Sequence, residues 1–237
     1  MNHLKKTMSL IEAKPFLREN QGKKLGDLKA EYQQKFPEYL PYDMKINKGG
    51  VGQFLEKLIG LDNTSNATDF SDGELKTNKV DASGKPLETM FISQIARNFD
   101  DLISDSLSFS DSWMYRKIRN MLYVPICKVG DDAANWYIQA AYHISLDGNP
   151  KIYQQLETDF LEIRRQLKDH IATSPDGFIH TSNGRFIQIR SKDSKPYHPI
   201  FSNSYGREIS NKNHAFYFKK EFMDAVRNGE LDVEKIA

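Results

Sequence analysis

The chain has 237 residues, 39 % of them hydrophobic and 27 % charged, and its 33 basic and 32 acidic side chains leave a formal net charge of +1. This length is enough for one large domain or two lobes around a real core. No apolar run reaches the roughly 18 to 20 residues of a membrane span, and the first residues lack the pattern of a secretory signal. The single cysteine, Cys127, excludes an internal disulfide, so we expect a cytoplasmic protein without a membrane partner.

The first elements predicted along the chain are helices. Ser9 followed by Glu12 has the spacing of a capping box, and Pro15 is expected to kink or shorten the helix that follows. A second helix is predicted from about 25 to 36. Residues 47–61 are predicted to form a glycine-rich turn that leads into a third helix, because their apolar residues recur at helical spacing.

The later elements are strands broken by helices. Residues 74–80 favour an extended chain, and 87–95 alternate well enough to be the strand that returns beside it. The longest predicted helix covers about 150–172, where one apolar stripe indicates core packing. Further predictions are a helix at 113–120, strands at 121–129, 185–190 and 214–219, and a final helix that begins near 219. This order fits a mixed α/β or α+β fold in two lobes.

A cluster of two acids and a lysine follows the third predicted helix. Glu74 and Lys76 share one face of the predicted strand, and the turn before it would fold Asp69 back toward Glu74. Carboxylate oxygens suit Mg²⁺, and an adjacent ammonium can stabilise developing negative charge. These three side chains are the kind that metal-dependent hydrolysis of a phosphodiester requires. Asp72 is a rival to Asp69 as a metal ligand.

The basic side chains gather in one later segment. Residues 185–220 hold eight basic side chains against two acidic ones, together with several aromatic residues. A basic, aromatic-rich segment on a nearly neutral protein indicates a face that meets phosphates.

Four segments in this order resemble one known family. They are NKGGVGQFLEKLIG, DFSDGELKTNKVDASGKPLETMF, WMYRKIRNMLYVPI, and the pair FIQIRSK and AFYFKKEF. Together they resemble MutH, the strand-nicking endonuclease family of mismatch repair, and the related GATC-cutting type II restriction enzymes. The resemblance runs from about 25 to 226. It implies a restriction-endonuclease-like mixed sheet flanked by helices, in two lobes around a DNA cleft.

The resemblance also implies the roles of particular residues. The whole chain, 1–237, would be one endonuclease domain, with a catalytic lobe of roughly 1–120 plus part of the C-terminal half and DNA-recognition segments within roughly 185–220. The catalytic residues would be Lys48, Glu56, Asp69, Glu74, Lys76 and Lys117, of which Glu56, Asp69 and Glu74 would bind the metal. The residues in contact with DNA would be Arg190, Ser191, Lys192 and Tyr217.

The chain departs from the family pattern in two places. The gap between Asp69 and Glu74 is shorter than in MutH itself, and the family's arginine-proline-lysine reads Arg190-Ser191-Lys192 here. Two biological roles are therefore open: a mismatch-repair nickase and a stand-alone restriction enzyme. A catalytically inactive DNA-binding domain is the alternative from another functional class.

The resemblance finally implies a cofactor, a substrate and partners. The cofactor would be Mg²⁺, with Mn²⁺ as a substitute, and the substrate double-stranded DNA cut at GATC or a related short palindrome. A nickase would have a MutL-type activator. The protein would be a monomer away from DNA, with a dimer on DNA as a further state.

Overall fold

The computed structural model describes residues 8–37, 50–61 and 68–237, and these residues group into two compact units. Unit 1 comprises residues up to 88 together with 119–145 and 232–237, and unit 2 comprises 89–118 and 146–231. The catalytic lobe expected over roughly 1–120 is a functional division and stays a prediction, but in the fold residues 89–118 belong to unit 2.

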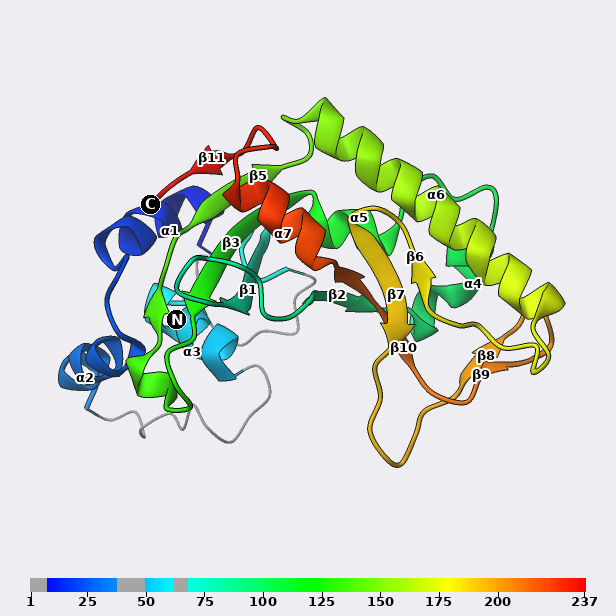
Figure 1. Cartoon of the computed structure of the whole chain (residues 1–237), viewed down its shortest axis with the longest axis horizontal. Helices are drawn as coiled ribbons and strands as arrows, with labels where there is room; N and C mark the ends of the chain where they lie inside the picture. The colour runs from blue at the N-terminus through cyan, green and yellow to red at the C-terminus, as the bar shows by residue number, and fades with distance from the viewer. Residues whose placement is uncertain (1–7, 38–49, 62–67) are drawn as a thin grey trace, which may run out of the picture. The chain divides into compact units, whose positions relative to one another are not determined.

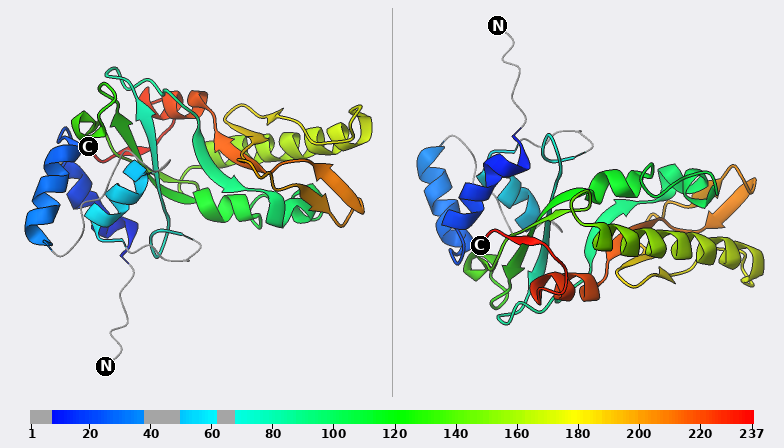
Figure 2. Two further views of the ribbon diagram at one scale, coloured as in Figure 1. Left: turned by 90° about the horizontal axis from the view of Figure 1, so that it is seen from below. Right: turned by 90° about the horizontal axis from the view of Figure 1, so that it is seen from above.

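Three helices build one side of unit 1: α1 (Leu10–Glu19), α2 (Leu25–Lys35) and α3 (Gly50–Ile59). The predicted capping box is present, since the Ser9 backbone N–H donates to the Glu12 carboxylate at 2.8 Å. The helix continues past Pro15 to Glu19. In both views of Figure 2 these helices lie beside the strands of unit 1, and their apolar side chains share one core with Phe70, Leu75 and Leu122.

The sheet of unit 1 is mixed. Its main path is β1 (Glu74–Val80), β3 (Asn120–Cys127), β5 (Tyr142–Ser145) and β11 (Glu234–Lys235), and β4 (Tyr137–Ile138) pairs with β3. β1 and β3 are parallel, with Glu74 opposite Met121, whereas β5 runs antiparallel to β3. A short 3₁₀ turn, Ala133–Asn135, precedes β4. β1 therefore forms an edge of the sheet, with one side of its backbone turned away from β3.

The prediction that the return strand pairs with β1 is wrong. The strand itself exists as β2 (Met90–Gln94), but it pairs with β10 in unit 2. Antiparallel contact with β1 is made before β2 begins, by a bridge between Val80 and Pro86 and by a hydrogen bond from Leu87 N–H to the Lys79 carbonyl. Alternation along a strand identifies its buried face but not its neighbour. Met90 and Ile92 are buried in unit 2, whereas β1 satisfies its backbone against β3.

Unit 2 is a second sheet against a long helix. Its order is β2-β10-β7-β6, and Figure 1 shows α6 running along it. The predicted apolar stripe of α6 is buried from Ile152 to Ile171. The strands are β6 (Ser182–Asn183), β7 (Ile187–Ser191) and β10 (His214–Phe218), with a separate hairpin of β8 (Ile200–Ser202) and β9 (Arg207–Ser210). The helices are the 3₁₀ turn Ala96–Asn98, α4 (Phe99–Ile103), α5 (Trp113–Ile118), α6 (Pro150–Thr173) and α7 (Lys220–Arg227).

The two units together give the mixed α+β architecture that the order of elements predicted. In the part of the chain that the structure describes, no helix combines the length and the apolar character needed to cross a membrane.

Candidate functional site

Two of the predicted site residues form a buried ion pair on β1. Glu74 and Lys76 are two residues apart and so point to the same face of the strand. The Lys76 ammonium donates to Glu74 Oε1 at 2.9 Å, and the two residues are only 9 % and 5 % exposed, respectively. Burial of both partners strengthens their attraction, because little water screens it.

Asp69 binds to the same strand, β1, on the edge that does not pair with β3. Its Oδ2 accepts a hydrogen bond of 2.9 Å from the backbone N–H of Leu75, which lies between Glu74 and Lys76. Successive residues of a strand aim their backbone groups to alternate sides, and an edge strand leaves one side without ladder partners. Asp69 satisfies one such donor, so its carboxylate lies at the start of β1 as the sequence predicted.

Glu56 reaches the same cluster from α3. Burial, followed by the nearby charges of Asp69 and Glu74, raises the pKa of Glu56 from 4.5 to about 7, while Lys76 acts in the opposite direction. Groups that shift one another's pKa in this way are close neighbours. The structure therefore brings together four predicted residues: Glu56, Asp69, Glu74 and Lys76.

A buried polar pair continues the same face of β1. The Tyr123 hydroxyl of β3 donates to Asn78 Oδ1 at 2.7 Å, and Asn78 follows Glu74 and Lys76 at the same two-residue spacing. Sequence reasoning passed over both residues. The strand spacing of Asn78 was a signal for its position, but nothing local indicated Tyr123.

Asp72 has a different environment from Asp69. Its Oδ1 accepts a 2.8 Å hydrogen bond from the backbone N–H of Leu10, the first residue of α1. Asp72 is also not among the charges that raise the pKa of Glu56. The carboxylate of Asp72 therefore serves to anchor a helix, where a negative charge near the N-terminus is favourable.

The acidic cluster suits a small divalent cation in its donor chemistry. No group of three or more His, Cys, Asp and Glu side chains within the described ranges is already arranged to hold a metal ion. Mg²⁺ commonly takes only one or two carboxylates from a protein and fills its shell with water and substrate phosphate. Asp69 and Glu74 meet that requirement, and the raised pKa of Glu56 reflects its burial and, after that, the nearby negative charge that a cation would relieve.

Two other predicted catalytic residues are not part of the cluster described in unit 1. Lys48 lies outside the described residues. Lys117 lies on α5 in unit 2, where its ammonium is 5.9 Å from the centre of the Trp113 ring.

The predicted DNA-contact residues come together in unit 2. Arg190 and Ser191 end β7, Lys192 follows them, and Tyr217 lies on the neighbouring strand β10. The Arg190 guanidinium lies 4.4 Å from the centre of the Tyr217 ring, and the Lys192 ammonium lies 3.4 Å from that of Phe91. Both distances fit cation–π contacts.

Phe91 was not predicted as a site residue. It lies on β2, and its ring meets Tyr217 edge to face at 5.8 Å. The sequence placed Phe91 in a strand, but its neighbours became evident only once β2 was found beside β10.

Two aspartates fix the backbone around these residues. Asp159 of α6 is buried and accepts hydrogen bonds from the backbone N–H groups of Arg185, Phe186 and Ile187, just before and within β7. Asp193 accepts from the backbone of Asn213 and from the ring and backbone of His198. These hydrogen bonds hold the pKa of Asp193 far below its usual range. Asp159 thus holds the start of β7, and Asp193, which follows Lys192, holds the backbone just before β10.

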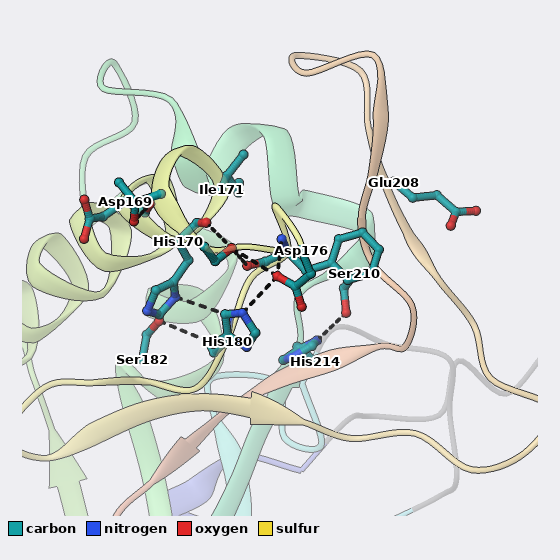
Figure 3. Close-up of polar contacts among 12 residues, drawn as sticks. Asp169, His170, Ile171, Asp176, His180, Ser182, Glu208, Ser210 and His214 are labelled. Carbon is teal, nitrogen blue, oxygen red and sulfur yellow. Dashed lines mark hydrogen bonds and ion pairs between the residues drawn. The ribbon is translucent and has the colours of Figure 1, made fainter.

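A group of histidines borders β10. Figure 3 shows His170 and His180 in contact, with His180 Nε2 3.1 Å from Asp176 and His214 Nδ1 3.3 Å from Ser210. Burial lowers the pKa of both His170 and His214. These two rings are therefore neutral near pH 7.

Comparison with known proteins identifies related chains. A family model described as the DNA mismatch repair enzyme MutH matches residues 60–159, which include Asp69, Glu74, Lys76 and Lys117. The DNA mismatch repair protein MutH of Buchnera aphidicola is 28 % identical over 196 residues, which cover 77 % of this chain and 81 % of that protein. MutH of Haemophilus influenzae strain PittGG is 28 % identical over 209 residues, which cover 83 % and 86 %.

A further relative and one solved structure extend the comparison. MutH of Serratia proteamaculans is 27 % identical over 195 residues, covering 79 % of this chain and 80 % of its own. A complex of the restriction endonuclease MvaI with its cognate DNA aligns over 90 % of this chain and 98 % of its own, at 12 % identity and a TM-score of 0.41. The family model covers 60–159, and the MutH relatives match over a larger part of the sequence. This chain is therefore similar to MutH proteins over about four fifths of its length, and the MutH family model matches its residues 60–159.

Proposed function

We propose that this protein is a divalent-metal-dependent endonuclease that hydrolyses a phosphodiester bond in double-stranded DNA at a short specific sequence. The observation that carries the proposal is the cluster in unit 1, where Lys76 donates to buried Glu74 while Asp69 and Glu56 lie beside them. The acids would hold a divalent cation, and that cation together with the Lys76 ammonium would stabilise the negative charge of the transition state of phosphodiester hydrolysis.

The cofactor in this proposal is Mg²⁺, with Mn²⁺ able to replace it. Asp69 and Glu74 would hold the cation, and Glu56 would complete the acidic set beside them. When bound, the cation would supply Lewis-acid stabilisation of the phosphate and help to generate the nucleophile from water. Asp72 is excluded from the ligand set in this proposal, because its carboxylate is used by the backbone of Leu10.

The protein side chains have separate tasks in the reaction. Lys76, held by Glu74, would stabilise the negative charge that develops on the phosphate oxygens. The hydrogen bond from Leu75 N–H fixes the Asp69 carboxylate before the substrate binds, so little reorganisation is needed at the moment of reaction. Lys48 and Lys117 are proposed as further cations near the scissile phosphate, on the strength of the family resemblance.

Recognition of DNA is assigned to unit 2. Arg190 is proposed to contact a guanine edge, and Ser191, Lys192 and Tyr217 to contact bases or phosphates. Support comes from their clustering on adjacent strands, with Arg190 stacked on Tyr217. A stacked guanidinium is partly pre-oriented, which reduces the entropy lost on binding. The proposed target is GATC or a related short palindrome.

The biological role that the relatives favour is strand nicking in mismatch repair. The relatives named above are mismatch repair proteins, and the chain covers about four fifths of their length. A MutL-type activator is part of this proposal, and so is a monomer away from DNA. A restriction enzyme would instead linearise plasmid without any activator.

The test is cleavage of supercoiled plasmid in Mg²⁺ buffer by the wild type and by Lys76→Ala. Removing the ammonium should lower the rate by about 10²-fold or more, while binding to duplex DNA is retained. Lys76→Met preserves the packing of the stem if the alanine variant folds poorly. Lys79→Ala is the matched control, because Lys79 lies on the same strand with its side chain 41 % exposed.

The outcomes separate the candidate functions. Undiminished cutting by both Lys76 variants would remove this residue from the mechanism. Binding of duplex DNA without cleavage by the wild type, in Mg²⁺ or Mn²⁺ and with a MutL-type protein added, would favour the inactive DNA-binding alternative. Nicking confined to the unmethylated strand of hemimethylated DNA would support the repair role, and unaided double-strand cutting the restriction role.

A further inference from the structure

We propose that Asn120 and His143 are positioning residues for the loop 68–73, which carries Asp69. This inference rests on the proposed function, since it concerns how the metal-binding carboxylate of that site is held. The observation behind it is a continuous series of hydrogen bonds that runs from the surface of unit 1 to this loop.

The loop is held at both of its ends. At one end the Asp69 carboxylate accepts from Leu75 N–H, and at the other the Asp72 carboxylate accepts from Leu10 N–H. Within the loop the backbone N–H of Phe70 donates to the carbonyl of Gly73 at 2.9 Å. Each of these bonds restricts the backbone between 69 and 73, so the position of Asp69 depends on that of Asp72.

Asn120 fixes the Asp72 end from the side of the sheet. It begins β3, one residue before the partner of Glu74, and its side-chain Nδ2 donates to the carbonyl oxygen of Asp72 at 2.8 Å. The packing here is close, because a Cβ added at Gly73 would collide with Leu10 Cδ1 and with the carbonyl oxygen of Asn120. The loop is thus packed tightly between α1 and β3, and the Asn120 side chain of β3 donates a hydrogen bond to it.

His143 supports the orientation of the Asn120 amide from its other side. Its Nε2 lies 2.8 Å from Asn120 Oδ1. Since Nδ2 of Asn120 donates to a carbonyl, Oδ1 must accept, and the proton of the imidazole therefore lies on Nε2. A hydrogen-bond partner that fixes the tautomer and orientation of the next group is the arrangement known from supports of metal ligands.

The other ring nitrogen is also engaged. The Lys14 ammonium lies 3.1 Å from His143 Nδ1 and 2.7 Å from Glu234 Oε2. With the ring proton on Nε2, Nδ1 accepts from Lys14. Glu234 Oε2, which lies 3.2 Å from Nδ1, neutralises the ammonium. The series therefore links α1, β11, β5 and β3 to the loop of Asp69, through Lys14, Glu234, His143 and Asn120.

The experiment compares two variants that break the series with one that keeps it. Asn120→Asp retains the size of the side chain but cannot donate to the Asp72 carbonyl. His143→Leu removes the donor to Asn120, whereas His143→Gln retains an N–H at the place of Nε2. Asn228→Asp is the control for the asparagine change, since Asn228 is exposed in unit 2.

The first measurement is amide hydrogen exchange without metal. We expect the N–H groups of Phe70, Ser71 and Leu75 to exchange about tenfold faster in Asn120→Asp and His143→Leu, as expected for the loss of one local hydrogen bond. The amide of Val124 in the middle of β3 should be unchanged. His143→Gln should match the wild type.

The second measurement is Mn²⁺ affinity by calorimetry, followed by Mg²⁺-dependent DNA cleavage. We expect the two disrupting variants to bind Mn²⁺ about tenfold more weakly, the typical effect of losing a support behind a metal ligand. Their DNA affinity without metal should stay at the wild-type value, while half-maximal cleavage should require correspondingly more Mg²⁺.

The outcomes separate this inference from the proposed function. Unchanged exchange and unchanged Mn²⁺ affinity in both disrupting variants would overturn the positioning role. Faster exchange throughout unit 1, including Val124, would also overturn it, because it would indicate a general structural role. Failure of the wild type to cut DNA would contradict the proposed function, while exchange and Mn²⁺ binding would still judge the positioning of the loop.

Discussion

Replacing Glu56 by glutamine should stabilise the protein while weakening its activity. Burial and the charges of Asp69 and Glu74 raise the pKa of Glu56 to about 7. A carboxyl group with a raised pKa in the folded state favours folding fully below its unfolded pKa, near 4.5. That contribution is lost as the pH rises through about 7, because the ionised group is then held in a negative, partly buried place. Glutamine has the same shape and never ionises.

The magnitude follows from the two pKa values. Going from 4.5 to about 7 corresponds to about 3 kcal/mol, at about 1.36 kcal/mol for each unit of pKa. Glu56 is only partly buried, so solvent screening reduces this to about 2 kcal/mol. We therefore expect Glu56→Gln to raise the free energy of unfolding by about 2 kcal/mol at pH 8.5 and by almost nothing at pH 4.5.

The assay is urea denaturation at pH 4.5 and pH 8.5 with a chelator present. Glu88→Gln is the matched control, since its carboxylate is 49 % exposed in the same unit and should show no such gain. Adding Mg²⁺ at pH 8.5 should stabilise the wild type more than Glu56→Gln, because the cation would relieve the same repulsion. An equal gain at both pH values, or none at pH 8.5, would refute this reasoning about the cluster.

Three further predictions concern unit 2. Asp159→Asn should lower the free energy of unfolding by about 2 kcal/mol, because Asp159 accepts from three backbone N–H groups; a urea denaturation loss under 0.5 kcal/mol, by roughly the same scale, would contradict this. Burial lowers the pKa of His214 below 6.5. The free energy of unfolding is therefore not reduced by His214 above pH 6.5, and it falls as the pH drops below that value, because the buried ring must then take up a proton. The thermal midpoint of His214→Gln should therefore fall less than that of the wild type between pH 7.5 and pH 5, and equal falls would argue against the assignment. Lys192→Ala should reduce the slope of log affinity for DNA against log salt by about 0.9 if Lys192 contacts a phosphate, and an unchanged slope would remove that contact.

Local patterns predicted most of the individual elements. The capping box at Ser9 and the stripe on α6 each depend on neighbours within a few residues, and both are present. The relation of Asp69, Glu74 and Lys76 also depends on short spacing, because one bend and one strand suffice to bring these residues together. Patterns of this range can be read directly from the sequence.

Relations between distant segments could not be predicted in the same way. The alternation of β2 was visible, but the change of unit between β1 and β2 was not, and so the hairpin was wrong. Phe91 acquires its contact with Lys192 only through that change. Asp159 looked like one more polar residue of a helix, and its role emerged only once the backbone at Phe186 was seen to donate to it.

The placement of β11 links the acidic cluster to a segment that follows unit 2 in the chain. β11 pairs with β5, and its Glu234 contacts the Lys14 ammonium that in turn meets His143. During synthesis, a ribosome-bound chain that lacks residues 232–237 would leave β5 with a bare edge and Lys14 without its carboxylate. Unit 1 can thus reach its final form only after unit 2 has been translated. A nascent fragment would then carry the acids and the lysine without the finished framework around them, which would delay any nuclease activity until residues 232–237 have been translated.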